Sequence, residues 1–371
     1  MVSVRGIAPC WLILICLLLG VSLAYWLGRD PPDLNTVALG EQTIPVYGSF
    51  EGRKMFCGTV AESAECLRTA KANGAARRVL WIGNSQLHAI NQYRPGQVTA
   101  PVLLAQRLAG EGIQVMGFSM PNASLSEMLL MYEWVASDYR PDVLLLPAFL
   151  DDTRELSIRS DLGPVARRPD IAALLDRSGI GADLRQRIMK EVSAEGEEEA
   201  DGSMQARSES WITRQLEDCC LLQTRRAAAR ANIEIHAYLL RNWAFNVNAQ
   251  TVRPIIPEIY RRNMAAADAL LADARNRGTR VIFYLPPIRQ DYAPPYDPAE
   301  YARFKREIAA MARRHGARPV DLDAIIPARY WGTKGSTTIG GAPELDFMHY
   351  QEPGHRMLAD AVLPIVREEL K

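Results

Sequence analysis

The sequence predicts an α/β protein with a parallel sheet, and two observations support this fold class. The first is a strand-helix-strand alternation in the first half of the chain: we expect strands at 78–82, 113–118 and 143–147, with helices at 101–110 and 124–136. The second is the return of the same pattern from residue 280 to the end. Strands that alternate with helices pair in parallel, because each crossover helix carries the chain back to the same end of the sheet.

The later elements follow the same pattern. We expect a strand at 280–285, a helix at 300–316, a strand at 318–322 and an amphipathic helix at 354–369. The alternation is interrupted at 153–278, which we interpret as a mostly helical insertion that forms a cap over the functional site. Within it, residues 195–203 are acidic and small without apolar spacing, which predicts a solvated loop.

The N-terminal part of the chain predicts export or a membrane anchor. No charged residue occurs from Gly6 to Gly28, which is long enough to cross a hydrocarbon core that takes roughly 20 helical residues. Residues 22–24 resemble a signal-peptidase site, but the apolar run continues through Leu27, which favours an uncleaved anchor at 7–27. We therefore expect an anchor or signal at 1–29, a spacer at 30–76, and a catalytic domain at 77–371 that faces the periplasm or the cell exterior.

Composition narrows the class of function. The chain has 371 residues, 48% of them hydrophobic, and its 43 basic residues balance its 43 acidic ones. Without a cluster of Lys and Arg, binding to nucleic acid is not supported. Cys57 and Cys66 could close a short disulfide loop in an oxidising compartment, or be two unrelated small apolar residues. No Cys/His spacing matches a zinc site, and we expect neither a metal nor an organic cofactor.

The candidate chemistry lies at the two ends of the predicted domain. The apolar run 80–82 ends in Gly83-Asn84-Ser85, which predicts a strand that delivers Ser85 to a sharp turn. Near the C-terminus, Asp346 precedes His349 by three residues, in a loop before the last helix. A carboxylate at that spacing can orient an imidazole that takes a proton from a serine. Ser85 could instead be only a helix N-cap, and His88 competes with His349 as the base.

These segments resemble the SGNH/GDSL hydrolase superfamily. Residues 83–85 match its first block and residues 346–349 its last, Asp-x-x-His, while 122–126 is similar to the second block and 141–146 to the strand before the third. The resemblance implies a three-layer, flavodoxin-like fold, with Ser85 as nucleophile, His349 as general base and Asp346 as the group that orients His349.

The oxyanion region departs from the family pattern. The second block begins at Asn122, and Glu127 aligns where the family usually has a glycine; Asp151 aligns where the third block usually has an asparagine. An ionised carboxylate there would oppose a developing oxyanion. We therefore expect one of three arrangements: Asp151 is protonated, Asp151 points away from the oxyanion, or the Ser85 N–H and other backbone groups donate the hydrogen bonds to the oxyanion.

An anchor, an insertion and the Asp-Phe-Met-His motif together resemble the membrane-anchored branch of the superfamily, which works with membrane-bound O-acyltransferases in teichoic acid D-alanylation and alginate acetylation. That resemblance implies transfer of an acyl group from a donor, through a Ser85 acyl-enzyme, to an envelope polymer. Two alternatives stay open: a plain esterase, and a catalytically silent module that binds an envelope glycan or a partner.

Overall fold

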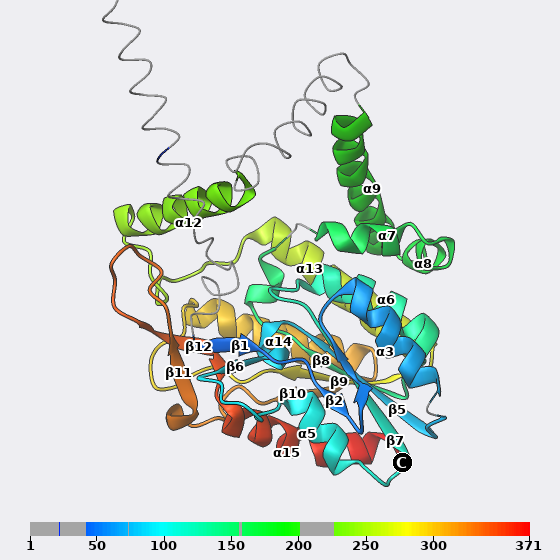
Figure 1. Ribbon diagram of the computed structural model, residues 1–371. Helices are drawn as coiled ribbons and strands as arrows, with labels where there is room; N and C mark the ends of the chain where they lie inside the picture. Colours follow the sequence, from blue (N-terminus) through cyan, green and yellow to red (C-terminus); the bar gives the residue numbers. More distant parts are fainter. Residues whose placement is uncertain (1–21, 23–41, 73, 156–157, 201–225) are drawn as a thin grey trace, which may run out of the picture. The chain divides into compact units, whose positions relative to one another are not determined.

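The computed structural model describes residues 22, 42–72, 74–155, 158–200 and 226–371 (Figure 1). They belong to two compact units. The larger comprises Gln42–Ala194, Ala249–Lys334 and Glu344–Lys371; the smaller includes Glu195–Asn248 and Gly335–Pro343. The larger unit holds the sheet and the candidate site.

Six parallel strands form the main sheet of the described chain, in the order β10-β9-β8-β5-β7-β4. Their bounds are β4 (Phe56–Cys57), β5 (Arg77–Gly83), β7 (Ile113–Ser119), β8 (Val143–Pro147), β9 (Arg280–Leu285) and β10 (Arg318–Asp321). From central β5 the chain passes to β7 on one side and then to β8 on the other. This reversal of direction puts the carboxyl end of β5 at a topological switch point, where open α/β sheets collect their functional groups.

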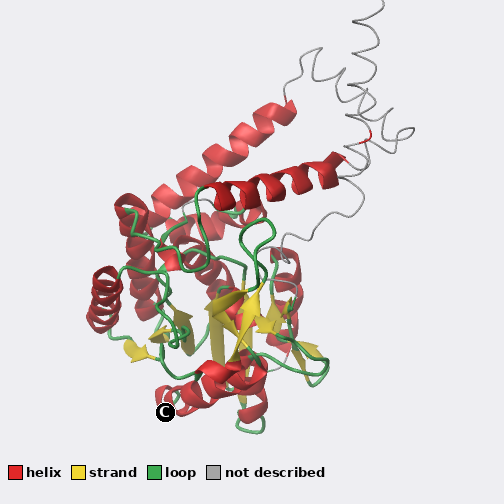
Figure 2. Ribbon diagram, turned by 90° about the vertical axis from the view of Figure 1, so that its left-hand side faces the viewer, coloured by secondary structure: helices red, strands yellow, loops and turns green. Residues whose placement is uncertain are grey.

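Helices cover both faces of the sheet, so the unit has three layers (Figure 2). Alternate residues of β5 face opposite layers: Leu80 and Ile82 join one core cluster, Val79 and Trp81 the other. The first cluster is covered by α3 (Val60–Ala72), α6 (Leu125–Tyr139), α13 (Pro257–Asn276) and α14 (Pro298–Arg314), and the second by α5 (Ala100–Arg107) and α15 (Glu352–Glu369). The predicted three-layer α/β class with a parallel sheet is confirmed.

Smaller elements complete the larger unit. Three antiparallel pairs lie outside the main sheet: β1 (Thr43–Pro45) with β6 (Ala89–Asn91), β2 (Ser49–Phe50) with β3 (Arg53–Lys54), and β11 (Trp331–Lys334) with β12 (Glu344–Tyr350). The short helices are α4 (Ser85–His88), η2 (Asp151–Thr153), η3 (Ser160–Leu162), α7 (Gly163–Ala166), α8 (Pro169–Leu175) and η4 (Ala328–Tyr330).

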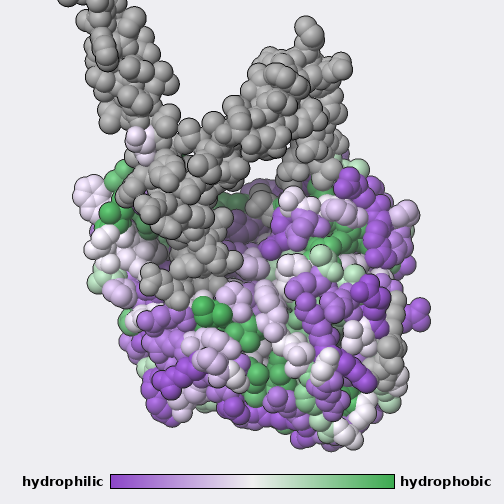
Figure 3. Space-filling view, in the orientation of Figure 1, coloured by the Kyte–Doolittle hydropathy of each residue, from purple (hydrophilic) through white to green (hydrophobic). Residues whose placement is uncertain are grey.

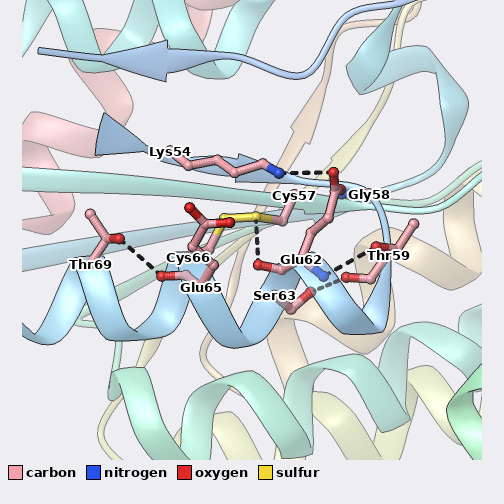
Figure 4. Close-up of a disulfide and its surroundings, with 9 residues drawn as sticks. All are labelled: Lys54, Cys57, Gly58, Thr59, Glu62, Ser63, Glu65, Cys66 and Thr69. Atoms are coloured by element: carbon pink, nitrogen blue, oxygen red, sulfur yellow. Dashed lines mark hydrogen bonds and ion pairs between the residues drawn. A yellow bond between two sulfur atoms is a disulfide. The ribbon is translucent and has the colours of Figure 1, made fainter. Parts of the chain in front are cut away.

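The expected spacer at 30–76 is wrong over the residues that the structure describes. From Gln42 onward the chain belongs to the larger unit, and β4 adds an edge strand beside β7. Its weak periodicity reflects very short strands that alternate with turns. The expected Cys57–Cys66 disulfide is confirmed, and it joins β4 to α3, where Lys54 also pairs with Glu62 at 2.8 Å (Figure 4).

The helical character expected for 153–278 is confirmed in its described part, but its status as a single insertion is not. Helix α13 packs against α6 and β9 and is the crossover helix that leads into β9. It therefore belongs to the core of the larger unit and is not part of an insertion. Helix α8 also contacts α6. The loop expected at 195–203 is wrong for residues 195–200, which end helix α9 (Gly179–Ala200), because Glu and Ala are strong helix formers.

In the smaller unit, helix α12 (Arg226–Ala244) is connected to the segment 335–343 by a 2.9 Å hydrogen bond from Asn242 to the Thr337 carbonyl. Among the described residues of the whole chain, no helix is both long and apolar enough to cross a bilayer. The expected anchor at 7–27 lies outside the described residues except for Ser22. On the face drawn in Figure 3, hydrophilic side chains predominate on the described surface and hydrophobic ones are scattered among them.

Candidate active site

The turn after β5 is shaped by its three residues. A Cβ at Gly83 would lie 2.5 Å from Leu87 and 3.1 Å from Pro147, so only glycine lets strand and helix approach this closely. Asn84 is the N-cap of α4, and its side-chain oxygen accepts a 3.0 Å hydrogen bond from the Gln86 N–H. Ser85 is therefore the first residue of the helix, at the carboxyl edge of the central strand.

The partner motif lies on a strand, so its expected placement in a loop is wrong. Strand β12 pairs with β11 at Trp331↔Tyr350 and next at Thr333↔Leu345. Between these two pairs β11 advances two residues while β12 advances five. Residues 346–349 therefore form a bulge of several residues, and bulges redirect side chains out of a regular ladder. The bulge allows Asp346 and His349 to face each other, as a regular strand would not for residues three apart.

The structure brings Ser85, His349 and Asp346 into one hydrogen-bonded chain. Ser85 Oγ lies 2.9 Å from His349 Nε2, and His349 Nδ1 lies 3.0 Å from Asp346 Oδ2. Because a carboxylate only accepts, Nδ1 carries the proton and Nε2 is left to accept the serine hydroxyl. All three residues are buried, at 2–6% exposure, which strengthens the electrostatic interactions between them.

The Asp346 carboxylate is held by several donors. Its Oδ1 accepts hydrogen bonds from the backbone N–H groups of Met348 and His349, at 2.9 and 3.0 Å. Burial alone would raise the pKa of Asp346, but the charge of His349 and these hydrogen bonds outweigh it and keep the pKa of this carboxyl below its usual range. Asp346 is therefore ionised at neutral pH and fixes the orientation of His349.

Three further hydrogen bonds, made by Gln86 and Asn84, hold the turn that carries Ser85. Gln86 Nε2 donates to the carbonyl oxygens of Pro287 and Met348, both at 2.7 Å, so the start of α4 is joined to the bulge that carries His349. Asn84 Nδ2 donates to Asp152 Oδ1 at 2.7 Å, and the Phe149 N–H donates to Asp152 Oδ2. Burial raises the pKa of Asp152 to about 8. The carboxyl ends of β5 and β8 are thus connected through side chains.

His88, the alternative base, does not contact Ser85. Its Nδ1 lies 2.7 Å from Ser119 Oγ and its ring stacks on Tyr47. Burial, with smaller electrostatic contributions from His349, His355 and Arg159, lowers the pKa of His88 to about 3. His355 is also buried, between the Ala100 N–H and the Ala89 carbonyl, and its pKa is likewise about 3.

The three residues expected near the oxyanion, Asn122, Glu127 and Asp151, have the following surroundings. Asn122 is exposed, with a left-handed φ of 51°. Glu127 forms the capping box of α6 with Ser124 and an ion pair with Arg159 at 2.9 Å, so it stabilises the N-terminus of helix α6. Asp151 accepts hydrogen bonds from Arg253 at 3.0 Å and from the Tyr296 hydroxyl at 3.1 Å, so its charge is compensated rather than directed at Ser85.

Sequence reasoning missed three residues that contact this site: Gln86, Asn91 and Asp152. Gln86 and Asn91 stand in the segment 85–91 without a motif to mark them, and Asn91 Nδ2 lies 3.3 Å from Asp346 Oδ2. Asp152 contacts Asn84, a residue 68 positions earlier in the sequence. Asp152 adjoins the residue selected by alignment, so a shift by one position would have found it. Within the described ranges, no group of three or more His, Cys, Asp or Glu side chains could hold a metal ion.

No family model and no curated protein matches this sequence. Among solved structures, the chain is similar to Axe2, an acetylxylan esterase from Geobacillus stearothermophilus, at 13% identity and a TM-score of 0.39, over 78% of this chain and 94% of that one. It is also similar to LAE5, an α/β hydrolase from the metagenome of Lake Arreo, at 12% identity and a TM-score of 0.39, with the same coverage. TesA matches at 11% identity and a TM-score of 0.35, over 79% and 99%. At these identities and TM-scores, the likenesses assign neither family nor function.

Proposed function

We propose that the protein is a serine esterase of SGNH type that forms an acyl-enzyme on Ser85. The observation that carries the proposal is the chain from Ser85 Oγ to His349 Nε2, at 2.9 Å, and from His349 Nδ1 to Asp346, at 3.0 Å. This arrangement of nucleophile, base and orienting carboxylate is the one that activates a serine for acyl transfer. The order of strands, with Ser85 at the switch point, supports the same proposal.

In the proposed reaction, Ser85 Oγ attacks the carbonyl carbon of an ester while His349 Nε2 takes the hydroxyl proton. The resulting imidazolium is stabilised by Asp346 and gives its proton to the leaving alcohol as the ester C–O bond breaks. Water then loses a proton to His349 and attacks the acyl-serine, which releases the carboxylic acid and restores Ser85. We expect the N–H of Ser85 to donate a hydrogen bond to the developing oxyanion.

A second candidate is transfer of the acyl group to an envelope polymer instead of water. The sequence feature that favours it is the uncharged segment 7–27, which would keep the domain at a membrane near an acyl donor such as a membrane-bound O-acyltransferase. The Cys57–Cys66 disulfide supports a periplasmic or extracellular location, because disulfides persist in oxidising compartments.

The test of an active serine is covalent labelling of full-length protein by a fluorophosphonate probe. We expect labelling of the wild type, none of Ser85→Ala, and a loss of about 10⁴-fold in rate for His349→Ala. His88→Gln is the matched control, a buried histidine three residues from Ser85 that contacts Ser119 instead, and it should keep most of the rate. Folded wild type that resists the probe would favour the silent binding module.

An experiment with an added acetyl acceptor distinguishes hydrolysis of the acyl-enzyme from transfer of its acyl group. The wild type should hydrolyse a small activated acetyl ester, and for an esterase the rate of acetate release should not change when an acetyl-acceptor oligosaccharide is added. Appearance of acetylated oligosaccharide, with a matching fall in free acetate, would instead establish the transferase.

A further inference from the structure

Asn91, which ends strand β6, makes a contact that the proposed reaction does not yet include. Its side chain is fully buried, and its Nδ2 lies 3.3 Å from Asp346 Oδ2 and 3.1 Å from the Thr333 carbonyl oxygen. Both neighbours only accept hydrogen bonds. The amide must therefore present its NH₂ group to them, because the opposite orientation would set oxygen against oxygen in a fully buried position.

Gly332 fixes this side chain in place. A Cβ at Gly332 would lie 1.8 Å from Asn91 Oδ1 and 2.5 Å from Asn91 Cγ, so the Asn91 amide occupies the space that a side chain at position 332 would fill. Gly332 belongs to β11, the strand that pairs with β12 and so with the bulge that carries Asp346. The Gly332 carbonyl is itself held by Arg289 at 2.8 Å. The Asn91 amide thus has little freedom to turn.

The contact completes a series of three between the nucleophile segment and the bulge. Ser85 contacts His349, Gln86 contacts the Met348 carbonyl, and Asn91 contacts Asp346, in antiparallel order. Asn91 and His349 donate to the same oxygen, Oδ2, while the backbone holds Oδ1. Because both oxygens of Asp346 accept hydrogen bonds, and from two directions, the plane of the carboxylate is fixed. The orientation of the His349 ring that donates to it is then fixed as well.

We propose that Asn91 is a positioning residue for this site: it holds the Asp346 carboxylate in the orientation that aligns His349 with Ser85. The inference rests on the proposed function of Ser85, His349 and Asp346. The competing explanation is structural, since the hydrogen bond to Thr333 alone could serve only to join β6 to β11. The two explanations differ in whether the effect of Asn91 depends on Asp346.

The first experiment measures the His349 Nδ1 proton by NMR in full-length protein, assigned by its loss in His349→Gln. Since Asn91 and His349 share Oδ2, Asn91→Leu should leave that oxygen to His349 alone and move the Nδ1 proton resonance downfield. Thr43→Val is the matched control, because Thr43 is the buried partner of Asn91 across β1 and β6 and makes no hydrogen bond to Asp346. An unchanged resonance in Asn91→Leu would overturn the proposal whether or not the probe labels the protein.

The second experiment uses fluorophosphonate labelling rates. Asn91→Leu should lower the rate about tenfold, as expected for one lost hydrogen bond to a charged group. In an Asp346→Ala background the same change should have no further effect, whereas a purely structural role would lower both rates equally. If the wild type is not labelled, the proposed function fails while the NMR result still decides the role of Asn91.

A third variant removes the contact without changing Asn91. Gly332→Ala should displace the amide and reduce labelling to about the level of Asn91→Ala, and the double variant should be no slower than either, since the added methyl then meets an empty space. Additive losses in the double variant would show that Gly332 acts through another contact and would count against the proposed geometry.

Discussion

Two buried histidines outside the Ser85–His349–Asp346 chain, His88 and His355, make the fold sensitive to acid. His88 and His355 are 0% exposed, and burial lowers the pKa of each from 6.5 to about 3. A histidine whose pKa is depressed in the folded state contributes its full stability above the unfolded pKa and loses it as the pH falls. The sensitive window therefore runs from about pH 6.5 to about pH 3.

The magnitude follows from the width of that window. At pH 5 the unfolded chain has bound a proton at each histidine while the folded chain has not, which costs about 2 kcal/mol per residue and about 4 kcal/mol for the pair. A typical domain is stable by about 5–15 kcal/mol in total, so the loss is large. Each histidine also adds about 1.4 kcal/mol per pH unit to the slope of stability against pH.

The assay is urea unfolding at pH 7, 6 and 5, followed by tryptophan fluorescence. His88→Gln and His355→Gln should each reduce the mean slope between pH 7 and pH 5 by about 1 kcal/mol per pH unit relative to the wild type, because each removes one group that takes up a proton on unfolding and this uptake is incomplete above about pH 6.5. Equal slopes for the wild type and both buried variants would refute the reasoning.

Three further predictions concern other parts of the chain. Reduction of the Cys57–Cys66 disulfide, or a Cys57→Ala/Cys66→Ala variant, should lower the free energy of unfolding by about 2.7 kcal/mol, the value for a closed loop of about ten residues; unchanged urea midpoints would contradict it. A periplasm-active reporter fused after Lys371 should be active and pellet with membranes, and release of full-length protein by osmotic shock would speak against an anchor at 7–27. Asp151→Asn should be labelled at a rate within about threefold of the wild-type rate and should lower the free energy of unfolding by about 1 kcal/mol, because it loses the ion pair with Arg253. Labelling about tenfold faster than the wild type would instead indicate that the Asp151 carboxylate repels the oxyanion.

The regular elements of this fold could be predicted from the sequence because their signals are local. The strand 280–285 has five buried, largely apolar residues after Arg280 and matches β9 residue for residue, and α6 begins one residue after the cap Ser124. Residues 42–57 gave no such signal, since strands of two or three residues are too short to show a period. The bulge in β12 could not be predicted either, because it depends on how far β11 advances beside it.

Motif spacing predicted which residues meet, but not what surrounds them. Asp346 and His349 are three residues apart, so their contact is a local property that a sequence can show. Glu127 and Asp151 were selected by alignment alone, and each proved to have a cation as partner: Arg159 for Glu127 and Arg253 for Asp151. A carboxylate in a nearly buried position needs such a partner, and the partner lies on a segment that the alignment did not consider.

The segment 84–91 has a physical role beyond delivering the nucleophile. Gln86 and Asn91 both follow Ser85 and contact the residues of the bulge that precede His349, so the separation of nucleophile and base is set by neighbouring contacts as well as by their own bond. A turn held only at Ser85 could rotate about the single hydrogen bond to His349. Three contacts in antiparallel order restrain both the orientation of the segment 84–91 and its distance from the bulge. Because a misplacement of about 1 Å can cost about 100-fold in rate, the Gln86 contact to the Met348 carbonyl and the Asn91 contact to Asp346 contribute to the proposed chemistry through the alignment of Ser85 with His349.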